Sequence, residues 1–525
     1  MKKQIIYLSK TIIIPVFLVF LASCDDFLDK KSPNKIDGDT FWTKPEDADK
    51  GIVGCYTKLD TATWAGAKTS YMSLHWEGLS DNGFCQSTLY GYYNVSKGTI
   101  SAASGEIVSA VWFEAYKGIA ACNYFLEKIE EIPNMDQARK NKLRGEALFL
   151  RAWWYNELTM CYGDVPLILE TLGYDESAYK VKRSPREKVV QQMYDDLDTA
   201  IRYLPAVSYT DGHAVQGSAL AYKARVAMYN NDFATAAAMA DKVIRSGLFR
   251  LHDDYNGIFF DQQTNNPEII FSIRYETPLN NTNLDLVYGS RFAVCVHGNL
   301  VDAYECTDGK LPAESSVYDP ATPYLNRDPR LKKTIFTKGD PWGYDKVNGF
   351  GYNQGKAESL PQTGFGLRKY VNYNVDPNVT TYSEQDFVKM RYADVLLMYA
   401  EAQITMARNG QGSVDQSVLN AINQVRARAY GADFTDLSAY PAITTFDLDE
   451  LQTIIRRERR IELAFEGLRY YDLKRWKIAE TVLPALTDPD SKKRSFDPKK
   501  HYLWPVPQAE IDIVGSDILS QNDGY

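Results

Sequence analysis

Carboxylates spaced four residues apart near the carboxyl end of the chain are the side chains best suited to acid–base or metal chemistry. They are Glu458, Glu462 and Glu466, and arginines are interleaved with them. Two carboxylates that face one groove about 5 to 9.5 Å apart can hydrolyse a glycosidic bond, and a cluster of them could hold a metal ion. The structural alternative is a helix whose carboxylates pair with arginines of neighbouring helices, such as Arg144 or Arg151. We favour this pairing, because carboxylates on one helix face repel each other and buried ones need partners.

Other catalytic or metal-binding patterns do not occur in the sequence. No local arrangement singles out a catalytic pair among the 68 acidic residues, and the five histidines show neither HxH nor HExxH spacing. There is no CxxC pair, and Cys122 and Cys161 fall in apolar helical patterns that are typical of a core. We therefore expect no metal, no cofactor and no disulfide framework.

Two irregular stretches, residues 63–104 and 280–370, combine aromatic with short polar side chains. An aromatic ring on an exposed loop can stack on the apolar face of a sugar while neighbouring exposed Asp, Asn or Arg side chains bond the sugar hydroxyls. Long irregular segments between helices commonly carry function. The candidate ligand-binding residues are Trp76, Asp81, Asn82, Tyr90 and Tyr92 in the first stretch, and Trp342 and Tyr344 in the second. Taken alone, each ring is more commonly a packing residue than a binding residue.

Helices with a strong 3.6-residue period must position these loops. We expect them at 45–61, 106–131, 136–162, 186–203, 217–230, 233–246, 386–408, 413–429 and 447–466. The pair at 217–246 has small residues on its facing sides and matches a tetratricopeptide-like helix hairpin. Residues 255–385 are rich in Pro, Gly, Asn and Asp, with short strand-like runs such as 268–275 and no expected helix.

The stretch 144–166 combines a dense run of apolar and aromatic residues with charges. Leu143, Ala147, Leu150 and Trp154 belong to one continuous apolar stripe, and aromatic residues crowd around it, so burial on more than one side is expected. Gly163 and Pro166 give a stop signal. Glutamates and arginines within a mostly apolar helix could indicate a catalytic site. We instead interpret the stretch as scaffold, with its charges paired to the later 458–475 helix.

The amino-terminal residues have the pattern of an export signal. A lysine-rich start is followed by an apolar run at 11–21, which is shorter than the roughly 20 residues needed to cross a bilayer. Leu21-Ala22-Ser23 then leads into Cys24, which resembles a bacterial lipobox whose cysteine is acylated. The alternative is an ordinary signal peptide with an incidental cysteine. Two or more acyl chains would anchor the protein stably to a membrane.

Composition and charge indicate a globular protein and argue against a nucleic-acid partner. The chain has 525 residues, 45% of them apolar, which is enough for a large core. The formal net charge is −9, and charges of both signs are spread along the sequence. Since no basic face is apparent, we do not expect nucleic-acid binding.

Several stretches, in the same order along the chain, resemble the SusD/RagB family of outer-membrane lipoproteins of Bacteroidetes. The resemblance is carried by residues 24–29, 144–166, 326–331, 391–397, 458–476, 503–507 and 521–522. It spans nearly the whole chain after the export signal. These are scaffold motifs, so they identify a family without naming a ligand.

The resemblance implies a mainly α-helical fold, in which tetratricopeptide-like helix pairs form a scaffold and loop-rich segments with minor β-structure pack on it. It also implies a protein on the outer face of the outer membrane that binds glycans or other nutrients. Such proteins act as the hinged lid of a SusC-like TonB-dependent transporter and are not enzymes. Asp81 occupies the Ser-Asp position that recurs in the family's ligand loop.

We therefore expect four segments: a lipoprotein signal peptide at 1–23, a lipidated tether at 24–45, an N-terminal SusD-like helical part at 46–250, and a C-terminal RagB/SusD part at 251–525. The last would carry the loop-rich ligand region and pack with the N-terminal part as one globule. The expected function is oligosaccharide binding at the cell surface, with Cys24 as the lipidation site. The alternatives are a surface-anchored glycoside hydrolase and a structural transporter partner without ligand affinity of its own.

Overall fold

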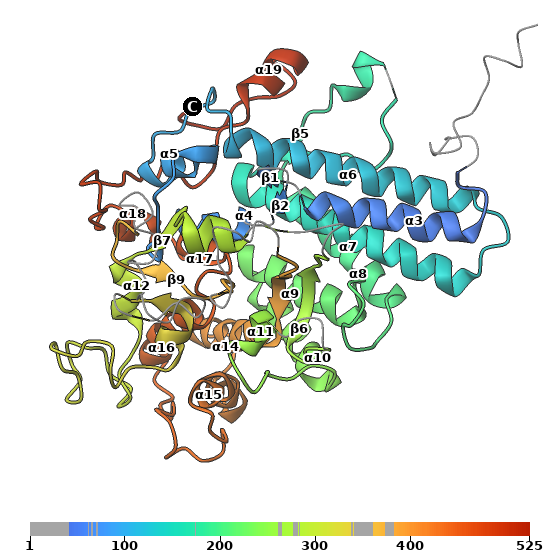
Figure 1. The fold of residues 1–525 in the computed structure, drawn as a ribbon. Coiled ribbons are helices and arrows are strands. Elements are labelled where there is room, and N and C mark those ends of the chain that lie inside the picture. Colours follow the sequence, from blue (N-terminus) through green and yellow to red (C-terminus); the bar gives the residue numbers. More distant parts are fainter. Residues whose placement is uncertain are drawn as a thin grey trace, which may run out of the picture.

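Helices stacked in sequence order form the body of the protein (Figure 1). The computed structural model describes residues 41–60, 62–64, 67–69, 72–173, 175–260, 265–276, 282, 284–337, 340, 361–372 and 383–525. The stack comprises α3 (Pro45–Tyr56), α6 (Ile107–Glu131), α7 (Gln137–Tyr162), α8 (Arg186–Tyr203), α9 (Gln216–Tyr229), α10 (Phe233–Ser246), α14 (Tyr392–Arg408), α15 (Gln416–Tyr430) and α16 (Leu448–Glu462). Each helix packs against its predecessor up to α15, and α16 packs on α14. The predicted mainly α-helical architecture is confirmed.

Shorter elements lie between and beside these helices. The short helices are α4 (Met72–Glu77), α5 (Tyr92–Lys97), α11 (Gly257–Phe260), α12 (Gly298–Ala303), α13 (Arg330–Thr334), α17 (Arg469–Arg475), α18 (Ala479–Val482) and α19 (Gln508–Val514). Single turns form η1 (Thr57–Leu59), η2 (Leu89–Gly91), η3 (Glu176–Tyr179) and η4 (Asp285–Ser290). Among the described residues, no helix is both long enough and apolar enough to cross a bilayer.

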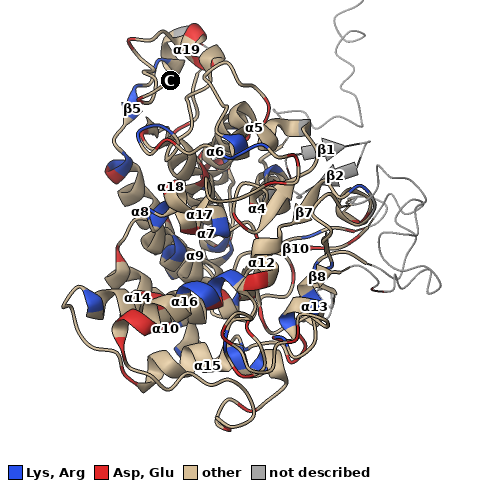
Figure 2. Cartoon of the chain, turned by 90° about the vertical axis from the view of Figure 1, so that its left-hand side faces the viewer, with Lys and Arg blue, Asp and Glu red and all other residues tan. Residues whose placement is uncertain are grey.

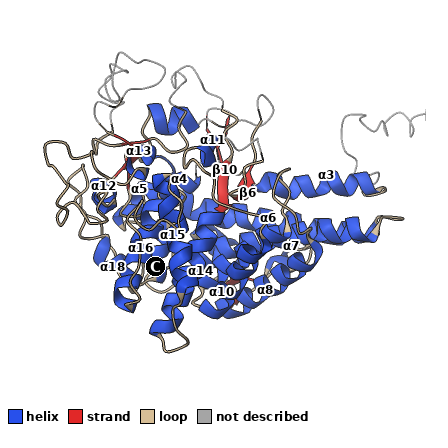
Figure 3. Cartoon of the chain, turned by 90° about the horizontal axis from the view of Figure 1, so that it is seen from below, coloured by secondary structure: helices blue, strands red, loops and turns tan. Residues whose placement is uncertain are grey.

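The strands form antiparallel pairs, and the longest of these lies along one side of the helical body (Figure 3). The pairs are β1 (Ala62–Trp64) with β2 (Ala67–Thr69), β3 (Gly83–Cys85) with β7 (Val294–Val296), β4 (Val165–Pro166) with β5 (Arg183–Ser184), β6 (Ile269–Ile273) with β10 (Phe387–Arg391), and β8 (Ile335–Phe336) with β9 (Gly366–Leu367). The predicted strand at 268–275 is confirmed as β6.

Three expectations about elements were wrong. Residues 387–391 form strand β10 and not the start of a helix, because the fully buried β6 needs a partner for its backbone groups. The helix then starts at Tyr392. Residues 255–385, expected to lack helices, contain α11, α12, α13 and the helical turn η4. The aromatic stretch at 63–104 likewise holds α4 and α5, which are too short for a helical period to be recognised.

Helix α7 is the centre of the apolar core. From Gly145 to Tyr162 nearly every residue is buried, as the aromatic density of this stretch predicted. Trp153 stacks on Tyr222 of α9 with ring centroids 4.5 Å apart, and both rings belong to the same core. The helix begins at Asp136, whose side chain accepts a hydrogen bond from Arg139 N, and ends before Gly163 at φ 74°.

The carboxylates of α16 are buried and bound to arginines, so the predicted ion pairing is confirmed. Arg330 Nη1 lies 2.5 Å from Glu458 and 2.8 Å from Glu462. Glu462 is also bound by Arg391 at 2.6 Å and by Arg428. All five side chains are at most 4% exposed. Figure 2 marks the dense charge along α16.

Glu466, just beyond α16, extends the same network. It binds Arg391 at 2.7 Å and Lys369 at 2.6 Å. The partners proposed from sequence were wrong: Arg144 binds Glu130, and Arg151 binds Asp196 at 2.7 Å. The arginines that reach α16 come instead from α13, β10 and α15. The apolar pattern of residues 144–166 could not reveal these partners, because it carries no information about distant segments.

We expect Gly118→Ala to destabilise the protein by about 1–3 kcal/mol, because an added Cβ on α6 would overlap the indole of Trp154 on α7. Gly54→Ala on the exposed side of α3 is the matched control, since nothing lies within 4 Å of its added Cβ. The control should raise stability by about 0.5–1 kcal/mol through helix propensity. Thermal melting of both variants tests this prediction. If the two variants change the melting temperature equally, α6 and α7 are not in close contact at Gly118.

We expect Glu462→Gln to cost about 3–5 kcal/mol, because it removes the one buried carboxylate that three buried arginines share. Burial alone would raise the pKa of the Glu462 carboxyl, but Arg428, Arg391 and Arg330 hold it well below its usual range. The ionised form therefore stabilises the fold above the ordinary glutamate pKa of about 4.3, and that stability is lost as pH falls further.

The difference in melting temperature between wild type and Glu462→Gln should therefore be largest at neutral pH, and it should decrease as the pH falls below about 4.3. Glu450→Gln, on the exposed first turn of the same helix, is the control and should change stability by no more than about 1 kcal/mol. A gap that is independent of pH would contradict the assigned role of the Glu462 charge.

Candidate functional site

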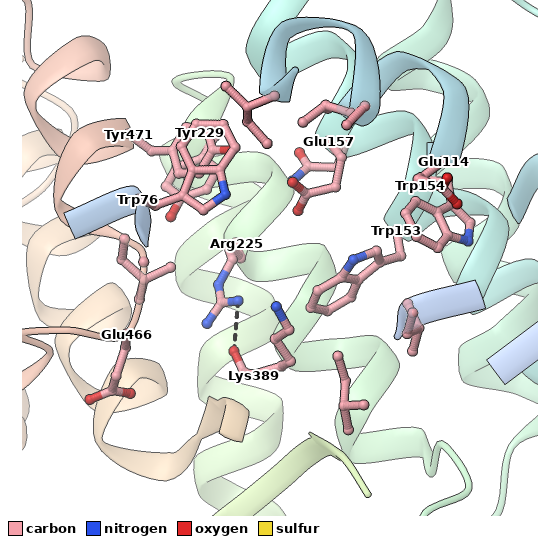
Figure 4. A pocket seen from close by; sticks show the side chains of 18 of the residues that line it. Trp76, Glu114, Trp153, Trp154, Glu157, Arg225, Tyr229, Lys389, Glu466 and Tyr471 are labelled. Carbon is pink, nitrogen blue, oxygen red and sulfur yellow. Dashed lines mark hydrogen bonds between the residues drawn. The ribbon is translucent and has the colours of Figure 1, made fainter. Parts of the chain in front are cut away.

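A cavity of about 260 Å³ lies where α6, α7 and α9 meet the strands β6 and β10 (Figure 4). Its aromatic lining residues are Trp76, Tyr90, Trp153, Trp154, Tyr222, Tyr229 and Tyr471. Its polar and charged lining residues are Glu106, Glu114, Asn156, Glu157, Arg225, Lys389 and Glu466. Aromatic walls with a few convergent polar groups are the usual composition of a small-molecule site.

Helical and strand periodicity places the central side chains of the cavity. Trp153 and Glu157 are four residues apart on α7, and Arg225 and Tyr229 have the same spacing on α9, so each pair occupies one helix face. Lys389 is the central residue of β10 and the only incompletely buried side chain of that strand. Two helices and a strand thus direct polar groups into one space.

Glu157, Arg225 and Lys389 point into the cavity from three sides in Figure 4. Arg225 is held in place, because Nη1 donates to Lys389 O at 2.9 Å and Nη2 to Asp394 at 2.7 Å. Burial raises the pKa of the Glu157 carboxyl, against the opposing charges of Lys389 and Arg225. Burial also lowers the pKa of the Lys389 ammonium to about 8, against the charge of Glu157. Both groups therefore sit where a neutral form is less costly than it would be in water.

Five polar atoms of the lining residues have no hydrogen-bond partner among the described residues. They are Trp154 Nε1, Asn156 Oδ1, Arg225 Nε, Tyr229 Oη and Tyr471 Oη, and all five are buried. Buried polar atoms in folded proteins nearly always find a partner, and an orphaned one calls for an explanation such as a bound polar group. Their convergence on one cavity is typical of a site for a ligand with several hydroxyls.

Two of the residues predicted from sequence to bind ligand line this cavity. Trp76 presents one edge to it and stacks on Trp504, with ring centroids 5.0 Å apart and planes 7° from parallel. Tyr90 is partly buried and has φ 65°, a left-handed conformation that bulky residues rarely adopt. Backbone strain of this kind gathers at functional sites. Trp76 and Tyr90 thus lie in the wall of the candidate cavity, and their role as ligand contacts stays a prediction.

The exposure expected of Asp81, Asn82 and Tyr92 was wrong, since all three are at most 2% exposed. Asp81 accepts bonds from Arg469 at 2.8 Å, and Arg460 lies 3.0 Å away. Burial would raise the pKa of the Asp81 carboxyl, but these two arginines hold it well below its usual range.

The other two residues of this group are also committed to the scaffold. Asn82 donates to Glu77 at 2.9 Å and accepts from Arg460 at 2.8 Å. Tyr92 packs between the rings of His75 and Trp76. Asp81 and Asn82 thus tie the loop after α4 to α16 and α17, whereas Tyr92 packs on α4. Trp342 and Tyr344, predicted from the second irregular stretch, lie outside the described residues, as does Cys24.

Sequence reasoning missed Trp153, Arg225 and Lys389 as cavity residues. It noticed Glu157 inside an apolar helix and set it aside as scaffold. The available signal was that a glutamate lies within an almost wholly apolar stripe, one turn after a tryptophan. Among the described residues, no three His, Cys, Asp or Glu side chains gather as metal ligands. Cys55, Cys85, Cys122, Cys161, Cys295 and Cys306 are buried free thiols.

Comparison with known proteins covers both halves of the chain. The model of the SusD family matches residues 257–525, and a second model, described as starch-binding associating with outer membrane, matches residues 26–228. SusD-like protein P2 of Formosa agariphila is 28% identical over 521 residues, which cover 97% of this chain and 98% of the relative.

Solved structures agree with this relationship. A SusD-like carbohydrate-binding protein of Bacteroides fragilis superposes with a TM-score of 0.80 at 28% identity, covering 90% of this chain and 99% of the other. A laminarin-binding SusD-like protein shares the fold with a TM-score of 0.71 at 23% identity, covering 92% and 100%. The resemblance seen in the sequence is thereby confirmed, together with the tetratricopeptide-like fold that it implied. Because the family model spans just over half of the chain and the relatives cover nearly all of it, the protein belongs to the SusD family.

Proposed function

We propose that the protein is a lipid-anchored, outer-membrane protein of the cell surface that binds an oligosaccharide. In this proposal it acts as the lid of a SusC-like TonB-dependent transporter. Family membership supports it, as does similarity to a carbohydrate-binding protein of Bacteroides fragilis. The description of the second family model, starch-binding associating with outer membrane, supports the location and the ligand class.

The observation that carries the proposal is the aromatic cavity with its orphaned polar atoms. A sugar ring presents apolar C–H faces to aromatic walls and hydroxyls to polar groups, and the cavity supplies both. Asn156 Oδ1 can accept a hydroxyl proton, Arg225 Nε can donate, and Tyr229 Oη can do either. At about 260 Å³ the cavity is slightly smaller than the roughly 300–1,000 Å³ of typical ligand pockets, so it suits one ring or a chain end.

Trp76 and Tyr90 are proposed ligand contacts because they line this cavity. Trp342 and Tyr344 stay candidates on the sequence pattern alone. Binding without turnover is proposed, and the pairing of the buried Glu458 and Glu462 with arginines supports it. The competing hydrolase would release reducing ends from a glycan panel. A purely structural partner would co-purify with the transporter and bind no glycan.

We expect Glu157→Gln and Tyr90→Ala each to weaken binding of the preferred glycan by about tenfold, the first through exchange of a hydrogen-bonding carboxyl for an amide and the second through loss of ring stacking. Glu157→Gln should leave the fold intact, because burial already disfavours the ionised carboxylate. Glu127→Gln and Phe446→Ala, both exposed and outside the cavity lining, are the matched controls. Titration calorimetry with a panel of soluble polysaccharides and their oligosaccharides measures the change. Wild-type affinity in both cavity variants would exclude the cavity as the glycan site.

We expect Cys24→Ser to release the protein from the membrane fraction, because the acyl chains would have no thiol to join. Radiolabelled palmitate should be incorporated into wild type and not into the variant. Cys55→Ser, at a buried thiol of α3, is the control and should retain the label. Membrane association that persists in Cys24→Ser without label would contradict lipid anchoring at this residue.

A further inference from the structure

A groove of about 470 Å³ lies at the surface of the helical body, between α6, the segment that follows β4, and α19 (Figure 1). It shares no lining residue with the aromatic cavity. Its lining is chiefly apolar and includes Trp112, Phe113, Tyr116, Ile119, Ala120, Pro166, Ile168, Leu172, Tyr179, Val181, Ile513, Val514 and Leu519. Phe113, Tyr179 and Ile513 are 40%, 51% and 77% exposed. Apolar side chains gathered at a surface in this way mark a place where another segment, chain or membrane binds.

The polar groups in the wall of the groove are largely committed to protein partners. Tyr116 Oη donates to Pro166 O at 2.9 Å, and Lys117 lies 2.8 Å from Glu114. Among the described residues, none of the buried polar atoms that lack a hydrogen-bond partner belongs to this lining. A sugar would find few groups here to bond its hydroxyls, so the groove suits an apolar occupant.

The described part of the chain begins beside the same helix. The ring of Trp42 packs on Tyr124 of α6, with centroids 5.9 Å apart. Tyr124, Ala120 and Tyr116 are spaced four residues apart and share one face of α6, and the last two line the groove. The chain therefore enters the fold on the helix face that leads to the groove.

The segment before this entry point, residues 25–40, is long enough to return to the groove. Phe27 and Leu28 are its one pair of adjacent large apolar residues. From Phe27 to Phe41 the chain can span at most about 50 Å. The distance along α6 from Tyr124 to Phe113 is only about 17 Å. A segment attached so close has an effective concentration on the order of millimolar, so a small apolar contact is enough to hold it.

We propose that residues 25–40 fold back along α6 and cover this groove, with Phe27 and Leu28 seated between Phe113 and Ile513. Removal of these apolar surfaces from water is the driving force. Asp26 and Asp29, on either side of the apolar pair, stay in water at the rim of the groove. Docking of this segment depends on neither glycan binding nor acylation.

The docked segment would fix where the amino terminus leaves the globule. Cys24 precedes Phe27 by three residues, so it would be held within about 10 Å of the groove. With Cys24 acylated, as proposed above, the side of the molecule that carries α6 and α19 lies next to the membrane. The segment then sets the orientation of the globule on the bilayer as well as its distance from it.

The first test is photo-crosslinking of the full-length chain in phosphatidylethanolamine vesicles, with benzoylphenylalanine incorporated in place of Phe27. We expect links to residues of the groove on α6 and α19 of the same chain, located by mass spectrometry. A mixture of isotope-labelled and unlabelled protein distinguishes links within one chain from links between two copies. Links chiefly to lipid, or chiefly to a second copy, would overturn the proposal and assign the groove to that occupant.

The second test measures the rate at which trypsin cleaves after Lys30 and Lys31 in the same full-length protein. A docked segment is cleaved only while it is released, so the rate reports the released population. Ile513→Asp places a charge in the groove at a largely exposed position, where the fold is not at risk. Phe27→Ser changes the segment itself and leaves the described fold untouched. Each should speed cleavage about tenfold.

Phe446→Asp is the matched control, because Phe446 is 51% exposed and lies outside the groove. It should be cleaved at the wild-type rate. Unchanged cleavage in Ile513→Asp and Phe27→Ser, or an equal increase in Phe446→Asp, would overturn docking of the segment. Neither result would bear on the aromatic cavity, whose glycan affinity is measured separately.

Discussion

Pairing of buried charge is the constraint on which the rest of the structure depends. Glu462 is fully buried, and it is bound by arginines from three separate elements: Arg330 of α13, Arg391 at the end of β10 and Arg428 of α15. An unpaired ion in this position would cost several kcal/mol, so the four elements are stable only when they come together. Charge pairing therefore sets the mutual positions of α13, α15, α16 and β10, and β10 in turn forms one wall of the aromatic cavity.

The same constraint distinguishes scaffold from site. Around α16 every carboxylate of the network has at least two cationic partners. In the cavity wall, by contrast, Asn156 Oδ1 and Tyr229 Oη have no hydrogen-bond partner among the described residues. Natural proteins depart from full polar satisfaction mainly where function requires it. The contrast favours the cavity over the more conspicuous glutamate series as the place where a ligand binds.

The sequence predicted the long helices well, because a 3.6-residue apolar period is a local property that each segment carries by itself. It could not predict which arginines meet Glu462, since Arg330 and Arg391 lie far away along the chain and only the fold brings them together. For the same reason Asp81 was expected to be exposed, although Arg469 covers it from 388 residues away. The cavity escaped notice because Trp153, Arg225 and Lys389 each belong to an element that, taken alone, has the pattern of a core.

The stacking of Trp76 on Trp504 has a consequence for the order in which the contacts of the cavity wall form during folding. Trp504 is fixed by backbone bonding to Cys161 at the end of α7 and by the side chain of Asn522. One wall of the cavity is thus braced by residues that follow the helical stack in the sequence. Contacts between residues so distant in sequence require a long loop to close before they stabilise anything. The wall that contains Trp76 is therefore completed only when the segment around Trp504 has packed against it.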